Sequence, residues 1–448
     1  MREGVAVVIP AWRETGRLPP LVRTVAAMRG CAEIVVACTR AEEYEVREAL
    51  AGAPAVRVVA ARRGRAAQMN AGAACTSAEW LLFLHADSTP HPDALTRILA
   101  IADPREVGGS CRLALDAGGW RPRLIEWMVR RRVRLLGLPY GDQGLFVRRR
   151  AFAELGGYRD LPLMEDVDFV RRLRRLGRLR HLSCPVVTSA RRWERDGWTR
   201  RTLSNWSLML QYLAGASPAR LARRYTGRCE GIVGVFARTP AAGGKSRLWR
   251  ALGREPDVRL LAAMLEDTLD LVERAGDVDR VLVAQPAPGE RTVNARAGWD
   301  VILQEGDDLG MRMHNALVEL LGLGYESAIL IGSDVPTLPA EVLRRAVSLL
   351  ADGRTDLVLG PSEDGGYYLV GTRTPHPELF TGIPWSTPAV LARTLERARA
   401  LGLSVALVDR WYDIDGPDDL RRAASELTPE GARTKRAIRD SGSGLKDS

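Results

Sequence analysis

Single carboxylates that directly follow apolar runs are the first residues in this chain that could do chemistry. Asp87 follows the run LLFLHA, and Asp334 follows the run ILIGS. A carboxylate at the end of a strand can hold a divalent cation that bridges phosphate oxygens. An aspartate in such a place can equally be a turn or helix-cap residue, and Asp87 does precede Ser-Thr-Pro. For each aspartate taken alone, both interpretations stay open.

Further candidates in the first half lie at the starts of expected helices. The segment GRAAQMNAGA places Arg65 and Asn70 near a helix start, where phosphate binding is natural. Glu165 and Asp166 open an amphipathic helix in the segment LMEDVDFVRRLRRLG. Acidic side chains in a first turn often only complement the helix dipole. One of them could instead serve as the general base for an incoming hydroxyl group.

A lone lysine is the main candidate in the second half. Of the 65 Lys and Arg residues only three are lysine, and Lys245 is the only one before residue 435. It lies in PAAGGKSRL, whose glycines would let backbone N–H groups approach a phosphate closely. Lysine offers a compact point charge, whereas arginine offers a longer planar fork. The spacing is not that of a Walker A loop, because Thr239 stands where the first glycine belongs. Chance survival of one lysine is the alternative.

Other loops of the second half also carry carboxylates. Asp364 precedes Gly365 and Gly366 in GPSEDGGYYLVG, where the glycines permit a tight backbone approach. Similar loops supply Asp308, Arg312, Asp413 and Asp415. Any one of these aspartates is more often a cap or turn residue. Because three such loops each follow an expected strand, together they indicate a nucleotide-type site.

Two series of alternating strands and helices would position these residues. The runs GVAVVI (4–9) and GIVGVF (231–236) each read as the buried first strand of a parallel sheet. In both halves further apolar runs alternate with helical patterns, which predicts an α/β fold with two tandem doubly wound domains. Ligands of such sheets bind beyond the carboxyl ends of the strands. The predicted domains are residues 1–226 and 230–427, followed by a disordered polar tail at 428–448.

Composition excludes several classes of protein. The chain has 448 residues, 46% hydrophobic and 27% charged, which is globular and too long for one ordinary core. The net charge is +10, yet no Lys/Arg run is interleaved with aromatic residues, so no nucleic-acid partner is expected. The six cysteines form no CxxC pair and do not cluster with the histidines, which argues against a zinc site or a disulfide scaffold. The first apolar run is too short for a signal peptide, and a cytoplasmic location is expected.

Five motifs of the first half resemble those of one known family. In chain order, VVIPAWRE, GRAAQMNAGA, FLHADS, GDQGLFVRR and MEDVDF look like a family 2 glycosyltransferase of the GT-A fold, closest to the bacterial arsenosugar-biosynthesis-type subgroup. The resemblance covers nearly all of residues 4–226. It implies a metal-dependent transferase in which Asp87 holds Mg²⁺ or Mn²⁺ and Asp166, beside Glu165, is the base. It also implies nucleotide contacts from Pro10, Ala11, Glu14, Arg65, Asn70, Arg192 and Trp193.

The implied chemistry suits these residue types. Displacing a nucleoside diphosphate from a sugar carbon leaves negative charge, which a metal and arginine stabilise. A carboxylate on the opposite face activates the acceptor hydroxyl, so a single displacement inverts the anomeric centre. Two departures from the family pattern are present: His85 stands where many relatives have Asp, and ACTR follows the second strand where many have a base-contacting Asp. The expectation of a UDP-sugar donor therefore rests only on how common such donors are in the family.

The motifs of the second half are similar to the DUF2064 family, which in turn resembles nucleotidyltransferases of the molybdenum-cofactor guanylyltransferase kind. The resemblance covers roughly residues 231–422 and implies a second GT-A/Rossmann-like sheet. One departure is Arg238, where relatives commonly have lysine. The implied site has phosphate contacts from Lys245 and Arg247, metal ligation by Asp334, a weaker metal or substrate candidate in Asp364, and nucleotide contacts from Gly365 and Gly366.

These resemblances predict a bifunctional transferase. The second domain would activate a sugar phosphate by nucleotidyl transfer, and the first would move the sugar from a nucleotide sugar to a hydroxyl acceptor. Two alternatives stay open: both domains transfer sugars, or one domain is a non-catalytic nucleotide-binding or regulatory module. The segments at 123–138 and 198–215 are amphipathic, basic and rich in tryptophan. They could lie on the inner face of an anionic membrane and receive a lipid-like acceptor, or form a domain or homo-oligomer interface around a small-molecule acceptor.

Overall fold

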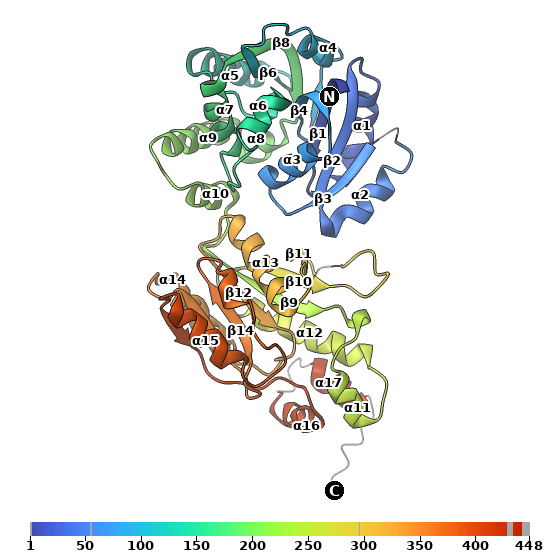
Figure 1. Ribbon diagram of the computed structural model, residues 1–448, viewed down its shortest axis with the longest axis vertical. Coiled ribbons are helices and arrows are strands. Elements are labelled where there is room, and N and C mark those ends of the chain that lie inside the picture. Colours follow the sequence, from blue (N-terminus) through green and yellow to red (C-terminus); the bar gives the residue numbers. More distant parts are fainter. Residues whose placement is uncertain (1, 54–55, 295, 428–432, 441–448) are drawn as a thin grey trace. The chain divides into compact units, whose positions relative to one another are not determined.

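The chain folds into two compact units, residues 1–226 and 227–448 (Figure 1). The computed structural model describes residues 2–53, 56–294, 296–427 and 433–440. Each unit builds one mixed β-sheet with helices on both of its faces. The predicted α/β class with two Rossmann-like doubly wound sheets is confirmed.

The sheet of unit 1 has eight strands in the order β3-β2-β1-β4-β7-β6-β8-β5. The strands are β1 (Arg2–Pro10), β2 (Cys31–Thr39), β3 (Val56–Ala61), β4 (Ala78–Phe83), β5 (Ser88–Pro90), β6 (Glu106–Leu115), β7 (Leu145–Arg148) and β8 (Arg178–Thr188). Strand β1 pairs in parallel with β2 and β4, whereas β7 runs antiparallel between β4 and β6. The predicted parallel arrangement therefore holds for the first four strands and ends at β7.

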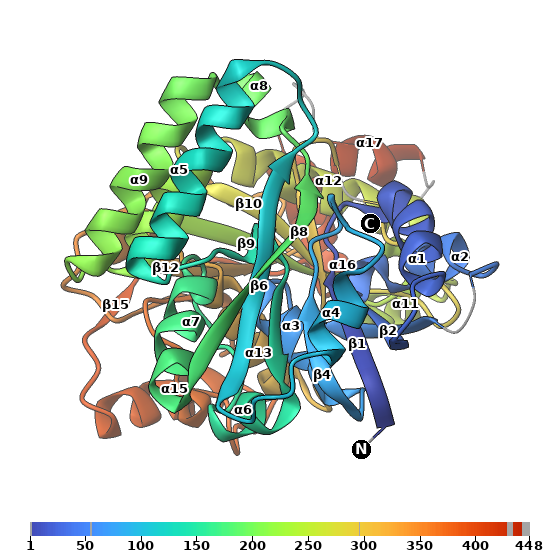
Figure 2. The same cartoon turned by 90° about the horizontal axis from the view of Figure 1, so that it is seen from above.

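Helices connect these strands. They are α1 (Leu18–Ala26), α2 (Glu43–Ala49), α3 (Arg65–Ala74), α4 (Ala94–Leu99), α5 (Trp120–Leu136), α6 (Arg149–Glu154), α7 (Glu165–Leu176), α8 (Arg191–Asp196), α9 (Trp198–Leu213) and α10 (Pro218–Thr226). Short 3-10 turns are η1 (Thr15–Arg17), η2 (Arg40–Glu42) and η3 (Gly141–Gln143). Figure 2 shows α5 and α9 lying side by side.

Unit 2 repeats the plan with a seven-stranded sheet of order β11-β10-β9-β12-β14-β13-β15. Its strands are β9 (Gly231–Arg238), β10 (Asp279–Gln285), β11 (Asp300–Leu303), β12 (Ser327–Gly332), β13 (Leu357–Pro361), β14 (Tyr367–Thr372) and β15 (Val405–Leu407). Its helices are η4 (Pro240–Ala242), α11 (Ser246–Leu252), α12 (Val258–Glu273), α13 (Leu309–Gly322), α14 (Ala340–Ala351), η5 (Pro377–Leu379), α15 (Val390–Ala400), α16 (Pro417–Glu426) and α17 (Arg433–Asp440). As in unit 1, one antiparallel strand, β14, follows four parallel ones.

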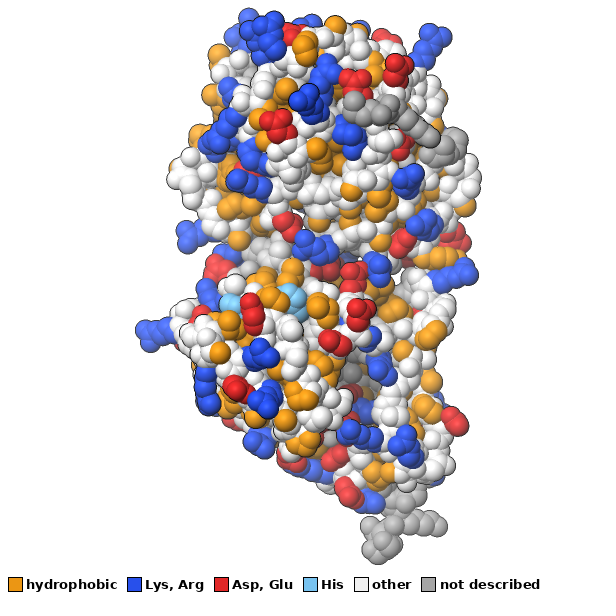
Figure 3. Space-filling model, viewed as in Figure 1, with side chains coloured by type: hydrophobic (Ala, Val, Ile, Leu, Met, Phe, Trp, Pro, Cys, Tyr) orange, Lys and Arg blue, Asp and Glu red, His pale blue; other side chains and the backbone are white. Residues whose placement is uncertain are grey.

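The positive charge of the chain is distributed over its surface. Figure 3 shows Lys and Arg side chains scattered over the visible face and interspersed with acidic ones. Within the described residues, no helix is both long and apolar enough to cross a bilayer.

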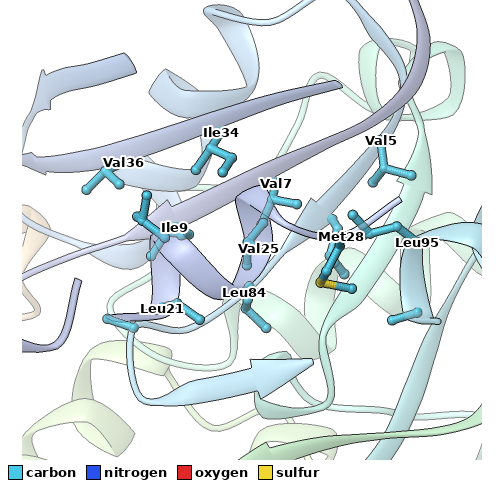
Figure 4. Packing of buried hydrophobic residues seen from close by; sticks show 14 of the residues in the cluster. Val5, Val7, Ile9, Leu21, Val25, Met28, Ile34, Val36, Leu84 and Leu95 are labelled. Atoms are coloured by element: carbon cyan, nitrogen blue, oxygen red, sulfur yellow. The ribbon is translucent and has the colours of Figure 1, made fainter. Parts of the chain in front are cut away.

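The first strand of each unit explains why its sheet carries helices on both faces. Val5, Val7 and Ile9 pack into one core cluster, with residues of α1 and β2, while Ala6 and Val8 pack into another (Figure 4). Because successive side chains of a strand point to opposite faces, a continuous apolar run buries both faces. In unit 2, Val233 and Ile232 divide in the same way between two clusters.

The predicted disordered tail is wrong for residues 433–440, which form helix α17. The helix docks because Asp267, a buried residue of α12, accepts hydrogen bonds from the backbone nitrogens of Arg433 at 3.1 Å and Thr434 at 2.8 Å. Ile438 of α17 is also buried in a core cluster. The polar composition concealed this docking, because two distant carboxylates, Asp267 and Asp270, and one buried isoleucine hold the helix. The rest of the predicted tail, 428–432 and 441–448, lies outside the described residues.

Replacing Asp267 by alanine is expected to destabilise unit 2 by about 2 kcal/mol, because two helix-end N–H groups lose a buried acceptor. Thermal denaturation of the full chain measures this loss, and limited proteolysis should show earlier cleavage near the C-terminus. The control is Glu255→Ala, which removes an exposed carboxylate from the same unit. An unchanged melting curve for Asp267→Ala would contradict the docking.

Candidate active sites

In unit 1 the candidate residues converge beyond the carboxyl ends of the central strands. Asp87 lies four residues after the end of β4, and Arg65 is the first residue of α3. Arg65 Nη1 lies 3.6 Å from Glu165 Oε1, at the start of α7. Burial alone would lower the pKa of Arg65, but the charges of Glu165, Asp166 and Asp87, among others, raise it. The three carboxylates that the sequence singled out therefore share one electrostatic neighbourhood.

Asp166 is held by two backbone N–H groups. Gly141 N donates to Asp166 Oδ2 at 2.7 Å, and Val167 N donates to Asp166 Oδ1 at 2.7 Å. A Cβ on Gly141 would come within 2.8 Å of His85 Nε2, so only glycine lets the η3 turn pack this closely. These contacts fix the orientation of the carboxylate, and they place the predicted base beside the loop that carries Asp87.

Two buried carboxylates in this site have raised pKa values. Burial, followed by the neighbouring Asp166, raises the pKa of Glu165 to about 7, against the opposing charge of Arg65. Burial also raises the pKa of Asp142 to about 6. Among the described residues, Asp142 Oδ1 is a buried oxygen that has no hydrogen-bond partner. Asp142 was not among the predicted site residues, although it lies in the motif GDQG; the available signal was its place three residues before strand β7.

A strained residue precedes the two acidic positions of α7. Met164 has φ 65°, in the left-handed region, and its side chain is buried. Non-glycine residues in this region cost about 1 kcal/mol or more and cluster at functional sites. The strained turn sets the direction in which Glu165 and Asp166 leave the backbone.

Basic residues of α3 and α8, Arg65 and Arg192, lie near His85. Burial, and then the charges of Arg65 and Arg192, hold the pKa of His85 well below its ordinary value, so this imidazole is neutral. Arg192 Nη1 donates to the Tyr225 hydroxyl at 3.0 Å. Arg191, its neighbour, pairs with Glu14 at 3.2 Å. Two arginines next to a neutral histidine and Asp87 form an environment that suits a diphosphate.

Of the remaining predicted contacts of unit 1, Ala11 and Asn70 have scaffold partners in this structure. Gln68 Nε2 donates to the carbonyl oxygen of Ala11 at 2.7 Å, and Pro10 ends strand β1 just before it. The side chain of Asn70 both donates to and accepts from the backbone of Tyr158, at 2.8 and 2.9 Å. Trp193 is half-buried, and its Nε1 is among the buried, unpartnered atoms of the described residues. These residues position loops, and their nucleotide contacts stay predictions.

The pKa of Glu165 predicts how the stability of unit 1 changes with pH. Because its pKa in the folded chain lies above its ordinary value of 4.5, the folded state binds the extra proton, and stability falls as pH rises from about 4.5 to about 7. Glu165→Gln should therefore raise the melting temperature at pH 8 and have little effect at pH 4. Thermal scans at both pH values measure this. Glu154→Gln, an exposed change, is the control, and a loss of stability in Glu165→Gln at pH 8 would contradict the expectation.

In unit 2 the lone lysine lies between two carboxylates. Lys245 Nζ is 2.7 Å from Asp334 Oδ2 and 2.7 Å from Asp415 Oδ1, and its side chain is only 5% exposed. Burial alone would lower the pKa of Lys245, but the two facing carboxylates raise it above its ordinary value. Lys245 has φ 56°, so its loop is also strained. A compact ammonium fits between two aspartates, whereas the planar fork of arginine is larger.

A third carboxylate completes this cluster. Asp413 accepts a hydrogen bond from Ser362 Oγ at 2.8 Å. Burial, and then the charge of Asp334, raise the pKa of Asp413 to about 7. Ile414 N donates to the carbonyl oxygen of Asp334 at 3.0 Å, which holds the 411–416 loop against the end of β12. Asp413 and Asp415 were recognised as carboxylates of a loop but were not predicted as site residues. Their distance from Asp334 along the chain gave no sign that the three side chains lie together.

The other predicted residues of unit 2 lie in exposed or structural positions. Asp364 is exposed and closes its own turn by accepting from Gly366 N at 2.9 Å. Gly365 has φ 90°, and a Cβ on it would lie 2.4 Å from the carbonyl oxygen of Pro388, so packing alone requires glycine there. Arg247 is exposed in the first turn of α11, and Asp308 caps α13 by accepting from Met311 N at 2.7 Å.

The donor sets of both units fit a hard divalent cation, although neither forms a cage for one. Among the described residues, no group of three or more His, Cys, Asp or Glu side chains is placed to hold a metal ion. In unit 2, however, Asp334 and Asp415 contact one lysine, and burial, followed by the charge of Asp334, raises the pKa of the nearby Asp413. Mg²⁺ commonly binds one or two carboxylates and completes its shell with substrate phosphates and water. Asp87 in unit 1 and Asp334 in unit 2 are suited to that kind of site.

Known proteins match each unit. Residues 2–207 match the family described as "Glycosyltransferase like family 2", and residues 268–387 match the family described as "Uncharacterized protein conserved in bacteria (DUF2064)". The chain is 27% identical over 195 residues to the phosphoenolpyruvate guanylyltransferase of Sphaerobacter thermophilus. The matched region covers 42% of this chain and 89% of the relative.

Solved structures give related matches. A candidate nucleotide-diphospho-sugar transferase from Desulfovibrio desulfuricans G20 is 28% identical with a TM-score of 0.42, over 48% of this chain and 95% of that one. The mannosyltransferase PcManGT from Pyrobaculum calidifontis, solved with GDP-Man and Mn²⁺, is 20% identical with a TM-score of 0.32, over 42% of this chain and 57% of that one. The family matches confirm the predicted resemblances at the level of the two families: residues 2–207 are glycosyltransferase-like family 2, residues 268–387 are DUF2064, and the C-terminal domain has nucleotidyltransferase homology.

Proposed function

We propose that the chain is a bifunctional transferase whose unit 1 moves a sugar from a nucleoside-diphosphate sugar to a hydroxyl acceptor. The observation that carries this is the convergence of Asp87, Asp166 and two arginines at one end of the sheet. Arg65 and Arg192 would neutralise the departing diphosphate, and Asp166 would take the acceptor proton. Asp87 would hold a Mg²⁺ or Mn²⁺ ion, which supplies Lewis-acid stabilisation of the same leaving group.

Unit 2 would transfer a nucleotidyl group from a nucleoside triphosphate to a phosphate-bearing acceptor such as a sugar phosphate. The Lys245–Asp334–Asp415 cluster supports this assignment, because it supplies one cation for phosphate oxygens and carboxylates for a divalent ion. Similarity to a phosphoenolpyruvate guanylyltransferase favours nucleotidyl over glycosyl transfer. Binding of a triphosphate would draw Lys245 from the aspartates towards the phosphates.

The test uses the full chain and two matched variants, Asp87→Asn and Asp334→Asn. The chain is incubated with Mn²⁺ and a panel of UDP- and GDP-sugars, and separately with CTP, GTP or UTP plus sugar phosphates. Release of nucleoside diphosphate and of pyrophosphate is measured. We expect Asp87→Asn to lose only diphosphate release and Asp334→Asn to lose only pyrophosphate release.

The other outcomes decide between the alternatives. If Asp334→Asn affects only the turnover of a nucleotide sugar, unit 2 is a second glycosyltransferase. If one of the two variants behaves as the unaltered chain in every assay, the unit that it alters is a binding or regulatory module. If the unaltered chain releases neither product with any donor, the proposal is wrong.

A further inference from the structure

The outward surfaces of α5 and α9 combine exposed apolar side chains with arginine. On α5, Trp120 is 69% exposed and Leu135 is 75% exposed, and on α9 Leu203 is 70% exposed. Five exposed arginines lie on α5 and one on α9. The exposed large apolar residues are Trp120, Leu124, Trp127, Leu135, Leu136, Leu203, Leu210 and Leu213, and the exposed arginines are Arg121, Arg123, Arg130, Arg131, Arg134 and Arg200.

These residues belong to one continuous surface. Helices α5 and α9 line the same small cavity, with Ile125 and Val129 from one side and Thr202 and Trp206 from the other. Figures 1 and 2 both show the two helices next to each other. We call their outward surface the α5/α9 face. Contiguous exposed apolar surface of this kind marks an interaction site on soluble proteins.

Neither α5 nor α9 contributes an exposed acidic side chain to the α5/α9 face. Residues 120–136 and 198–213 are described throughout, and Glu126 is the one acidic residue among them. Glu126 is half-buried, and its Oε1 accepts a hydrogen bond from Leu115 N at 2.9 Å, so it serves the fold. Arg131 instead lies over the ring of Trp127, with its guanidinium carbon 5.2 Å from the ring centroid.

We propose that the α5/α9 face binds the surface of an anionic lipid bilayer. Tryptophan is suited to the boundary between headgroups and acyl chains, because one end of the ring is apolar and the other can hydrogen-bond. Arginine pairs with lipid phosphate, and its stem can lie along apolar surface while the charge reaches the headgroups. The pattern of Trp and Leu next to Arg, without acids, is that of an interfacial helix pair.

Charge argues against a second copy of the chain as the occupant. A two-fold interface would place the α5/α9 face of one protomer on the same face of the other. Six arginines on each side would then meet without a carboxylate between them, and such like-charge contact is unfavourable. An anionic membrane supplies the missing negative charge. The proposal concerns binding alone and holds whether or not unit 1 transfers a sugar.

Flotation of the full chain with lipid vesicles tests the proposal. The probes are vesicles of phosphatidylcholine alone and of phosphatidylcholine mixed with phosphatidylglycerol. We expect flotation only with the anionic vesicles, decreasing as salt is raised because the Arg–phosphate attraction is screened. The double variant Arg130→Ser/Arg134→Ser should partition about 30-fold less, since each basic residue near the surface contributes roughly a factor of five. Trp120→Ala/Trp127→Ala should reduce partitioning by about tenfold.

Matched variants in unit 2 control for general effects. Arg397→Ser/Arg399→Ser removes two exposed arginines of α15, and Leu401→Ala/Leu407→Ala removes two exposed leucines. Both should float like the unaltered chain. Absence of flotation with anionic vesicles would overturn the proposal, as would equal loss in the unit 2 variants. The proposal would also be overturned if the unaltered chain bound no vesicles but formed concentration-dependent dimers in light scattering, and the α5 variants abolished these dimers.

Discussion

Asp166→Asn is expected to lower the rate of glycosyl transfer by roughly 1,000-fold, because general-base catalysis commonly contributes a factor of about 100 to 10,000. Asparagine has nearly the same shape, and its oxygen can still accept one of the two backbone N–H groups that hold Asp166. The donor should still bind, because Arg65, Arg192 and Asp87 are unchanged. The measurement is kcat for nucleoside diphosphate release together with KM for the donor, and we expect kcat to fall and KM to stay within a few-fold.

Two comparisons separate this effect from a loss of fold. Asp160→Asn alters an exposed, ion-paired carboxylate of the same unit and should leave kcat unchanged. Thermal denaturation of Asp166→Asn reports whether the η3 turn has loosened. A variant that is stable and turns over at the original rate would show that Asp166 only anchors Gly141, and Glu165 would then be the next candidate for the base.

Lys245→Met is expected to reduce nucleotidyl transfer by at least about 100-fold, since a positioned charge that stabilises a phosphate transition state is commonly worth that much. The variant should also lose about 1–2 kcal/mol of stability at pH 8. Asp334, Asp415 and Asp413 then face one another without the ammonium, although water screens the first two because they are 44% exposed. The loss should be smaller at pH 5, because protonation relieves a carboxylate whose pKa is raised in the folded state.

The same substitution separates two roles for the lysine. If Lys245 lies where a divalent cation would share the aspartates, Mg²⁺ should raise the melting temperature of Lys245→Met more than that of the unaltered chain. Arg250→Met, an exposed change on the same helix α11, should match the unaltered chain in both assays. Full nucleotidyl transfer by Lys245→Met would contradict any phosphate role for this residue.

Residues next to strand ends were the predictable part of both sites. Asp87 and Asp334 could be identified because each follows a buried strand, and the end of a parallel strand is an edge where ligands bind. Asp166 and Lys245 stood out by motif and by composition. The strain at Met164, two residues before Asp166, and at Lys245 itself could not be recognised, because nothing in residue type indicates a positive φ for methionine or lysine.

What the sequence could not show was convergence over long separations. Asp413 and Asp415 reach Asp334 from about 80 residues further along the chain, through a loop whose place depends on packing against β12. Asp142 acquires its raised pKa only when η3 is buried beside Asp166. Helix α17 depends on two carboxylates of α12, Asp267 and Asp270, which lie 166 and 163 residues away from Arg433. Local pattern carries no information on such pairings.

Each of the two units has a β-sheet and hydrophobic cores of its own. Each sheet takes all of its strands from its own unit, and each first strand divides its side chains between core clusters of that unit alone. Cooperative unfolding follows shared cores, so calorimetry should resolve two transitions rather than one. A destabilising change such as Asp267→Ala should move only the transition of unit 2. A mutation can therefore abolish the activity or the folding of one unit and leave the fold of the other unit unchanged.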